Sequence, residues 1–582
     1  MATADSGESL RYGSFELDTR SRELRTGATR IRLQQQPFEI LRMMLERPGR
    51  VVTREELQGR LWPNGTFVDY EHSLNAAIKR LRAALGDDAD NPRFVETLPR
   101  RGYRFIARSD EEASARAAAA DLKPPKSRLV VLPFVDLGEN GHDRYFADGL
   151  TEEMIAQLGQ MYRDRIGVIC RTSSMVFRDT AARAREIGEA LRAEYLLEGS
   201  VRRQGDRVRI SASLVNAATE AHLWTESYET TLADSLFVQQ DVAARIARSL
   251  AVELAPQIRQ QPLSGNAEAH QAYLKGLHYW NMVADTGAEQ AVKYLQRATQ
   301  LDPASAAAHA ALARARVLRA EYYNASPRTM LEAARVSAKR ALDLDPTFFE
   351  AHLALGEVQR MLEWDWRGAE TSYAKAIALN PSHAGPHRVY GLLLSALSRS
   401  AEAIRESERA CDMDPFCVVS NASGAAWVRF VAGDFDAAIA RAREGVELEP
   451  DYLPAHRILA ASYLQAGRQN EAISELEDAL ANAGDDPMTI AALAHAKAVT
   501  GQQRPALALI KKLTEGAQTR YTPSYHLALA YAGLGDADAA LASLEQAVVD
   551  RDPAVINVAV DPRLEPIRSD PGMIRLIDHL GL

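Results

Sequence analysis

The prolines of the C-terminal half fall at near-regular intervals, and this spacing restricts the possible folds more than any other feature. Pro303, Pro346, Pro381, Pro415 and Pro450 are separated by 43, 35, 34 and 35 residues. Proline ends a helix because it lacks an amide hydrogen and its ring clashes with the preceding turn. A period near 34 residues holds two helices, which bury their apolar faces only by stacking on neighbouring pairs. The sequence therefore predicts an all-α solenoid over residues 265–582.

Small and large apolar residues recur at fixed places within this period. The following residues keep the spacing in two of the repeats: Tyr390, Gly391, Leu394, Ala403, Ala410 and Pro415, then Leu459, Ala460, Tyr463, Ala472, Leu476 and Ala479. This pattern resembles the tetratricopeptide repeat, in which small residues let paired helices approach and larger ones fill the space between them. The longer step of 43 residues predicts an insertion around residues 321–329, and the tail from residue 562 predicts an amphipathic capping helix.

A tetratricopeptide solenoid implies a concave groove that binds a protein or a peptide. A structural spacer, or a surface for self-association, is the alternative. No groove residue can be chosen from one sequence. We interpret four tryptophans as helix-packing residues and two cysteines as small buried groups: Trp280, Trp364, Trp366 and Trp427, with Cys411 and Cys417.

The N-terminal region predicts a different, mixed fold. Alternating apolar residues over 11–33 indicate a small antiparallel sheet. A helix is expected after Pro37, and Thr53 with Glu56 has the spacing of a capping box that starts a second helix. Residues 71–86 form a third amphipathic helix, and residues 94–106 form a β-hairpin with arginines at its tip. A sheet, three helices and a basic hairpin are the parts of a winged helix.

Residues 8–108 resemble the OmpR/PhoB-type winged-helix DNA-binding domain, through IKRLRAAL in the third helix and FVETLPRRGYRF in the hairpin. The resemblance implies that the third helix enters the DNA major groove and that the hairpin, or wing, reaches the adjacent minor groove. Residues 1–108 carry 19 Lys and Arg against 15 Asp and Glu, although the whole chain has a net charge of −9. The cationic excess supports DNA binding in this segment.

The predicted DNA-binding residues lie on the third helix and at the wing: His72, Asn75, Lys79, Arg80 and Arg82, then Arg100 and Arg101. Arginine can donate two hydrogen bonds to guanine, so Arg80 is the predicted base reader, with Lys79 beside it in the groove. Arg82 and the wing arginines are predicted to meet phosphates, with a solvated surface charge as the alternative for Arg82 and Arg101. We expect Tyr103 and Phe105 to belong to the core of the wing.

Residues 109–127 predict a linker, and residues 128–256 predict an α/β domain with the order βαβαβββα. VLPF, FADGLTEE, YLLEGSVRRQGDRVRISASLV and LWTESYE resemble the N-terminal domain of the TolB-like family, which implies an interaction module. None of the phosphate-binding, dinucleotide-binding, zinc-protease or nucleophile-elbow motifs occurs. Asp136, His142, Asp143 and Asp148 lie close in sequence, and we interpret them as ordinary loop residues rather than a catalytic or metal site.

These observations predict a cytoplasmic transcriptional regulator that binds double-stranded DNA and is not an enzyme. Three cysteines and no run of 18 apolar residues predict no disulfide framework, no cofactor or metal, and no membrane segment. The repeats are expected to bind a protein or peptide partner, with RNA polymerase as a candidate, and the oligomeric state is open. One alternative is an interaction scaffold whose winged helix does not read DNA specifically. Another is an enzyme within residues 128–256.

Overall fold

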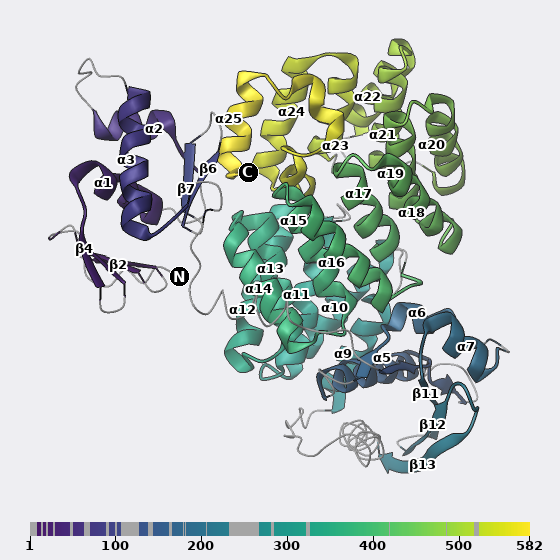
Figure 1. Cartoon of the computed structure of the whole chain (residues 1–582). Helices are drawn as coiled ribbons and strands as arrows, with labels where there is room; N and C mark the ends of the chain where they lie inside the picture. Colours follow the sequence, from purple (N-terminus) through teal and green to yellow (C-terminus); the bar gives the residue numbers. More distant parts are fainter. Residues whose placement is uncertain are drawn as a thin grey trace. The chain divides into compact units, whose positions relative to one another are not determined.

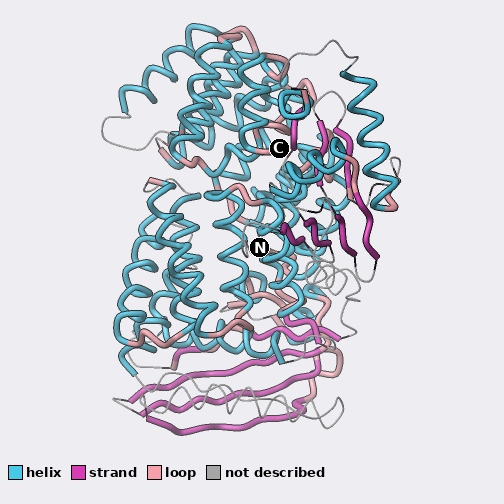
Figure 2. The backbone as a smooth tube through the Cα atoms, turned by 90° about the vertical axis from the view of Figure 1, so that its left-hand side faces the viewer, coloured by secondary structure: helices cyan, strands magenta, loops and turns pink. Residues whose placement is uncertain are grey.

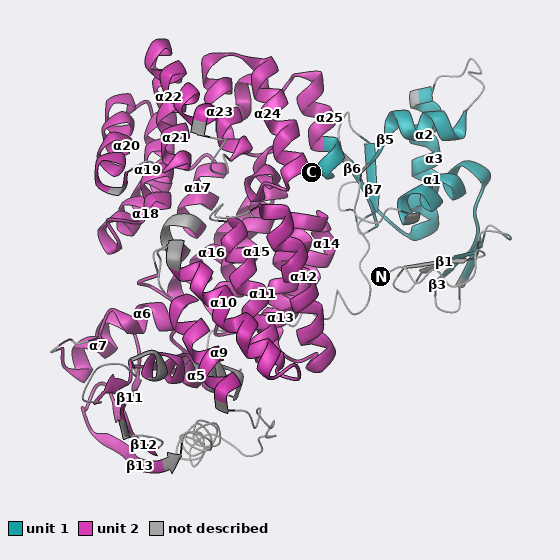
Figure 3. Ribbon diagram, turned by 180° about the vertical axis from the view of Figure 1, so that it is seen from behind, with its two compact units in different colours: residues 1–120, 578–581 teal, residues 121–577, 582 magenta. Residues whose placement is uncertain are grey.

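The computed structural model describes residues 9–105, 127–231 and 267–582, with short gaps inside these ranges at 13–14, 19–20, 22, 27–28, 47–50, 63–69, 89–91, 93, 99–101, 138–143, 162–165, 179, 181, 205–206, 281–284, 322–325, 418, 485 and 517–522. The chain divides into two compact units, residues 1–120 with 578–581 and residues 121–577 with 582 (Figure 3). Residues 109–126 of the expected linker and the expected helix 238–250 lie outside the described residues.

The described residues between 9 and 105 form two antiparallel sheets and three helices, which Figure 1 shows. The opening sheet has the order β1-β2-β3-β4, and the second has the order β5-β7-β6. The elements are β1 (Ser9–Tyr12), β2 (Phe15–Asp18), β3 (Glu23–Thr26), β4 (Thr29–Arg32), α1 (Gln35–Glu46), β5 (Val51–Thr53), α2 (Arg54–Leu61), α3 (Tyr70–Leu85), β6 (Val95–Leu98) and β7 (Gly102–Phe105). The predicted sheet, helices and hairpin are all present, and the short strand β5 is an addition that the sequence did not predict.

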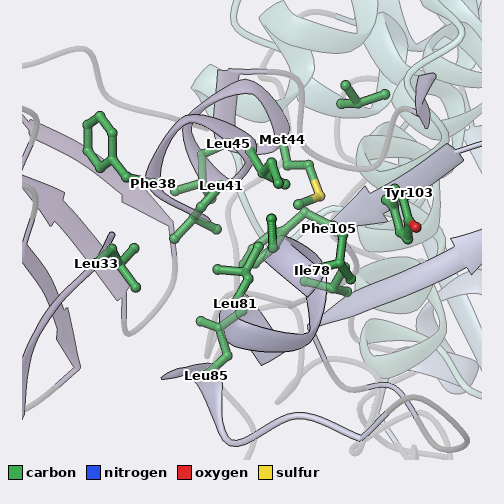
Figure 4. Close-up of a cluster of buried hydrophobic side chains, with 14 of the residues drawn as sticks. Leu33, Phe38, Leu41, Met44, Leu45, Ile78, Leu81, Leu85, Tyr103 and Phe105 are labelled. Carbon is green, nitrogen blue, oxygen red and sulfur yellow. The ribbon is translucent and has the colours of Figure 1, made fainter. Parts of the chain in front are cut away.

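Apolar side chains from the sheets and all three helices meet in one core (Figure 4). Phe38 and Met44 of α1 pack there with Leu81 of α3 and Phe105 of β7, and each is at most 3% exposed. Helix α1 begins at Gln35 and includes Pro37 in its first turn, so the expected start after Pro37 is wrong. Proline is tolerated there because the first amides of a helix have no intrahelical acceptor, and its missing amide hydrogen breaks no helix bond. This core fixes which face of α3 is buried.

The capping box predicted at Thr53 is present. The Thr53 hydroxyl accepts from the Glu56 amide at 3.1 Å, and the Glu56 carboxylate accepts from the Thr53 amide at 2.9 Å. Thr53 also ends β5, whose residues pair with β7. The same residue therefore starts α2 and joins it to the wing sheet.

An α/β region opens the second unit. It contains β8 (Ser127–Val131), β9 (Val135–Asp136), α5 (Arg144–Met161), β10 (Ile166–Val168), α6 (Arg171–Met175), α7 (Ala184–Leu191), β11 (Tyr195–Gln204), β12 (Arg207–Asn216) and β13 (His222–Thr231). The strands run in the order β10-β8-β11-β12-β13, parallel from β10 to β11 and antiparallel beyond, and β9 pairs with β11. Successive residues of β8 enter two different cores, Leu129 and Val131 on one face and Val130 on the other. The sheet is thus covered on both faces at its parallel end.

The rest of the second unit is a series of paired helices, shown as neighbouring cyan tubes in Figure 2. They are α9 (Ala267–Trp280), α10 (Asp285–Leu301), α11 (Ala306–Glu321), α12 (Pro327–Leu344), α13 (Phe349–Val358), α14 (Trp366–Leu379), α15 (Ala384–Ala396), α16 (Ser400–Met413), α17 (Trp427–Val431), α18 (Phe435–Leu448), α19 (Leu453–Gln465), α20 (Gln469–Ala483), α21 (Pro487–Val499), α22 (Gln503–Gly516), α23 (Ser524–Leu534) and α24 (Ala537–Asp550). π-Helical turns extend α13 as η2 (Gln359–Glu363) and precede α17 as η3 (Val419–Ala426).

The repeat pattern predicts this packing correctly. Each of the five spaced prolines lies two residues beyond the end of a helix, as Pro381 does after α14 and Pro415 after α16. A Cβ added at Gly391 would lie 3.2 Å from the Ala403 carbonyl oxygen, so this glycine permits α15 and α16 to approach closely. Ala403 and Ala410 on the facing helix are fully buried.

The longer repeat step and the tail differ in detail from the prediction. The 43-residue step reflects longer helices as well as a longer connection, because α11 and α12 have 16 and 18 residues against 13 and 14 in α15 and α16. The tail contains two 3-10 helices, η4 (Pro553–Asn557) and η5 (Pro562–Ile567), before the final helix α25 (Pro571–Leu580). Among the described residues, no helix has the length and apolarity needed to span a bilayer.

Candidate DNA-binding surface

Helix α3 is amphipathic, and its exposed face carries the predicted site residues. Leu74, Ile78 and Leu81 are at most 3% exposed and hold the helix in the core. Four of the predicted residues are exposed on the opposite face: His72, Asn75, Lys79 and Arg80. The structure therefore places these four side chains on one accessible surface of the helix, with two permanent cations among them.

Asn75 belongs to a polar network that joins all three parts of the winged helix. The Tyr103 hydroxyl of β7 donates to Asn75 Oδ1 at 2.8 Å, and Arg54 Nη2 of α2 donates to the same hydroxyl oxygen at 3.2 Å. The Arg54 guanidinium carbon also lies 5.2 Å from the centre of the Tyr103 ring. Tyr103 is 2% exposed, so its ring belongs to the core as predicted while its hydroxyl positions α3.

Arg80 is held at the surface by one neutral partner. Its Nη1 donates to Gln34 Oε1 at 2.9 Å, and both residues are exposed. Gln34 lies between β4 and α1, so it orients the arginine from a neighbouring segment. A single exposed hydrogen bond contributes about 1 kcal/mol, and exchanging it for a bond to a base costs little.

Arg82 has an intramolecular role that the sequence did not indicate. Its Nη2 donates to the Val95 carbonyl oxygen at 2.7 Å and to Thr97 Oγ1 at 2.8 Å. Asp87 adds a second link, since its carboxylate accepts from the amides of Phe94 and Val95 at 3.2 and 2.7 Å. Arg82 is half-buried and attaches the end of α3 to strand β6. Its contact with a DNA phosphate remains a prediction.

The wing strands carry a cross-strand ion pair. Arg104 Nη2 lies 2.6 Å from Glu96 Oε2, which neutralises this arginine on the hairpin. Arg100 and Arg101, the predicted wing contacts, lie outside the described residues. Sequence reasoning also missed Arg54 and Gln34, because their partners are distant in sequence and no local pattern marks them.

Family models match three parts of the chain. Residues 28–105 match the model described as "Transcriptional regulatory protein, C terminal", and residues 125–245 match "HilA/YgeH-like transcriptional regulator, second domain". Residues 430–496 and 523–548 match tetratricopeptide repeats. The first unit therefore contains an OmpR/PhoB-type winged-helix domain, and it is followed by a HilA-like regulator domain and tetratricopeptide repeats. The resemblance of the α/β region to the TolB-like family stays a prediction.

The similar proteins include regulators with related domains. The cholera toxin transcriptional activator of Vibrio cholerae is 39% identical over 101 residues, 17% of this chain and 34% of that protein. HilA of Salmonella typhi is 23% identical over 284 residues, 49% of each chain. A Rhizobium meliloti protein named "Putative adenylate cyclase 3" is 32% identical over 208 residues, 35% of each. The chain spans between about one third and one half of the length of these relatives.

Proposed function

We propose that the protein is a sequence-specific DNA-binding transcriptional regulator. The observation that carries the proposal is the exposed face of α3, where Lys79 and Arg80 lie opposite the buried leucines. An α-helix fits the major groove, and a basic face on it attracts the phosphate backbone while reaching base edges. Regulators among the relatives support the same function.

We assign the side chains of this surface to base contacts, phosphate contacts and positioning roles. Arg80 is the base reader, because its guanidinium can donate two bonds to guanine O6 and N7 once it leaves Gln34. Lys79 meets a phosphate or a base edge in the same groove, and Arg100 and Arg101 meet phosphates near the wing. Arg82 and Tyr103 position α3 relative to the wing, because their hydrogen bonds join the two.

The remaining domains would supply regulation. We propose that the α/β domain, as a TolB-like interaction module, and the tetratricopeptide repeats bind a protein or peptide partner, with RNA polymerase as one candidate. A partner changes DNA affinity only if it binds the DNA-competent state more or less tightly than the other state. The coupling is reciprocal, so cognate DNA must change partner affinity by the same factor.

Sequencing of genomic fragments retained by the full-length protein tests the proposal. An enriched motif is expected, and Arg80→Ala should reduce preference for the enriched site over random duplex by about 10- to 100-fold, the worth of one bidentate base contact. Arg30→Ala on β4 is the matched control, because it removes an exposed arginine from a different element. Unchanged duplex binding in an Arg80→Ala, Arg100→Ala double variant would show that the DNA surface is wrongly assigned.

The scaffold alternative predicts no enriched sequence in that experiment. We further propose that the protein performs no catalysis, and the cyclase name belongs to one relative matched over about a third of its length. A screen of nucleotides and metal ions against the thermal unfolding of the full chain tests this second proposal. A nucleotide that raised the unfolding midpoint and was then converted to product would overturn it.

A further inference from the structure

A cavity of about 510 Å³ lies within the second unit. Its wall combines Arg171 and Thr172 of α6 in the α/β region with residues of the repeat helices, including Arg314 of α11, Arg388 of α15 and His495 of α21. Sites for small molecules typically occupy about 300–1,000 Å³, so the cavity is large enough for a small metabolite.

Arginine is the dominant charged residue of this wall, and four of the six arginines are already paired. Arg171, Arg360, Arg457 and Arg563 lie 3.6, 3.4, 3.0 and 2.7 Å from the carboxylates of Glu152, Glu321, Asp486 and Asp561. Arg314 and Arg388 have no carboxylate oxygen within 4.0 Å among the described residues. Both are half-buried and line the cavity, so two cationic groups face it without a salt-bridge partner.

Burial alters the charge of the titratable groups that interact with Arg314 and Arg388. Burial lowers the pKa of His383 to about 3, with Arg314 and Arg388 contributing, so this histidine is neutral. Burial also raises the pKa of the Glu357 carboxyl to about 7 although Arg388, Arg360 and Arg314 oppose the shift. Burial therefore disfavours the ionised form of Glu357. Asp414 and Glu449 also line the cavity, and neither has a cationic side chain within 4.0 Å among the described residues. Burial raises the pKa of Asp414 to about 6.

Aromatic side chains give the same cavity an apolar part. The Arg314 guanidinium carbon lies 4.8 Å from the centre of the Trp280 ring, a contact that orients the cation without neutralising it. Trp427, Phe430 and Tyr452 add further apolar surface to the wall. Trp364 and Trp366 are buried packing residues as predicted, whereas Trp280 and Trp427 pack between helices and also line the cavity.

We propose that this cavity binds a small organic anion, whose carboxylate, sulfonate or phosphate group pairs with Arg314 and Arg388 and whose planar apolar body lies against the aromatic wall. Charge-assisted bonds to arginine are strong and directional, and removal from bulk water strengthens them. The site is separate from the DNA-binding face of α3 and stands independently of the proposed DNA-binding function.

Two fluorescent probes of matched shape test the proposal on the full-length protein. 8-Anilinonaphthalene-1-sulfonate carries one anionic group, and N-phenyl-1-naphthylamine has the same aromatic body without it. The sulfonate probe should bind saturably, and Arg314→Gln with Arg388→Gln should weaken its binding at least tenfold. Binding of the neutral probe should change less than twofold in the same variant. Displacement by benzoate or by phenyl phosphate then shows which anionic group the site prefers.

Controls separate a local effect from unfolding. Lys339→Gln with Arg340→Gln removes the same charge from exposed positions of α12 that do not line the cavity, and should leave sulfonate binding unchanged. Arg314→Lys with Arg388→Lys keeps the charge and provides a milder variant, which should bind the sulfonate more tightly than the glutamine variant does. Thermal unfolding midpoints of all variants confirm folding. Equal losses for both probes, or equal sulfonate binding in the wild type and the glutamine variant, would overturn the proposal.

Discussion

The Ser173 hydroxyl lies 2.5 Å from Asp414 Oδ1, although 241 positions separate the two residues in the chain. The Ser173 amide donates to the same oxygen at 2.9 Å, and the Phe416 amide donates to the Ser173 hydroxyl oxygen at 2.8 Å. Arg128 adds a bond to the Asp412 carbonyl oxygen, and the Phe177 and Phe416 rings meet edge to face. These contacts link the α/β region around α6 directly to the turn after α16 of the repeat region.

Removing the Asp414 carboxylate should loosen this junction. Asp414→Ala leaves the Ser173 amide and hydroxyl without their acceptor in a buried place, which costs about 1–3 kcal/mol. We expect faster hydrogen exchange in α6 and at residues 412–417, measured by mass spectrometry. Ser474→Ala on the exposed face of α20 is the control and should leave exchange unchanged. Equal exchange in Asp414→Ala and wild type would mean that packing alone holds the junction.

The same carboxyl predicts a pH dependence of stability. Burial raises the pKa of Asp414 from 3.8 to about 6, against the opposing effect of the hydrogen bonds from Ser173. The folded state therefore binds the proton more tightly than the unfolded chain, and this contribution to stability is full below pH 3.8 and is lost as pH rises through 6. Asp414→Asn, which is neutral at every pH, should remove that slope and stabilise the protein above pH 6. Urea unfolding of both proteins between pH 5 and 8 measures the difference, and parallel curves would contradict the assignment.

Gly102 of β7 lies so close to the backbone of β5 that a side chain would clash with it. A Cβ at this residue would lie 2.2 Å from the Val52 carbonyl oxygen and 2.9 Å from Thr53 Cα, both backbone atoms of β5. Gly102→Ala should therefore separate β7 from β5 and destabilise the winged helix by about 2–4 kcal/mol. Circular dichroism melting of the full chain, which has two compact units, should show the unfolding transition of the winged helix shifted to a lower temperature. Gly59→Ala is the control, because a Cβ there meets no atom within 4 Å.

Arg82→Met tests whether this residue positions the wing. The substitution keeps much of the side-chain volume and removes the bonds to Val95 and Thr97. We expect faster exchange of the β6 amides and a uniform loss of affinity across DNA sequences. Lys79→Met removes a charge from the same helix and should weaken DNA binding without altering exchange in β6. A loss of sequence preference in Arg82→Met, with β6 unchanged, would instead make Arg82 a reader of bases.

Patterns along the sequence predict most elements. Capping and apolar periodicity are visible within one helix or strand, and the proline spacing is visible within one repeat. Strand β5 was missed because three residues are too few to show alternation. The role of Arg82 was missed because its acceptors belong to a strand that the fold brings alongside. The cavity was missed for the same reason, since its wall joins residues as distant as Arg171 and Arg563.

The repeats contain a second regular signal besides the prolines. A histidine follows four of the spaced prolines by six residues, and each of these histidines has Nε2 within 3.4 Å of the carbonyl oxygen of its proline. The histidine thus links the first turn of a helix to the end of the preceding one. The histidine keeps the same distance from its proline in each of these repeats. The hydrogen bond that explains this spacing is seen only in the folded structure.

The network around Tyr103 restricts what Asn75 can recognise. Bidentate recognition of adenine needs the amide oxygen as an acceptor and the amide nitrogen as a donor in one plane. The oxygen already accepts from the Tyr103 hydroxyl with one of its two lone pairs, and we expect the Nδ2 group to make the base contact in the proposed complex. A donor alone matches the exposed acceptors of adenine, guanine and thymine in the major groove. Because every base pair offers an acceptor in the major groove, a contact through this donor would discriminate little, and we expect the operator to be degenerate at the position that Asn75 faces.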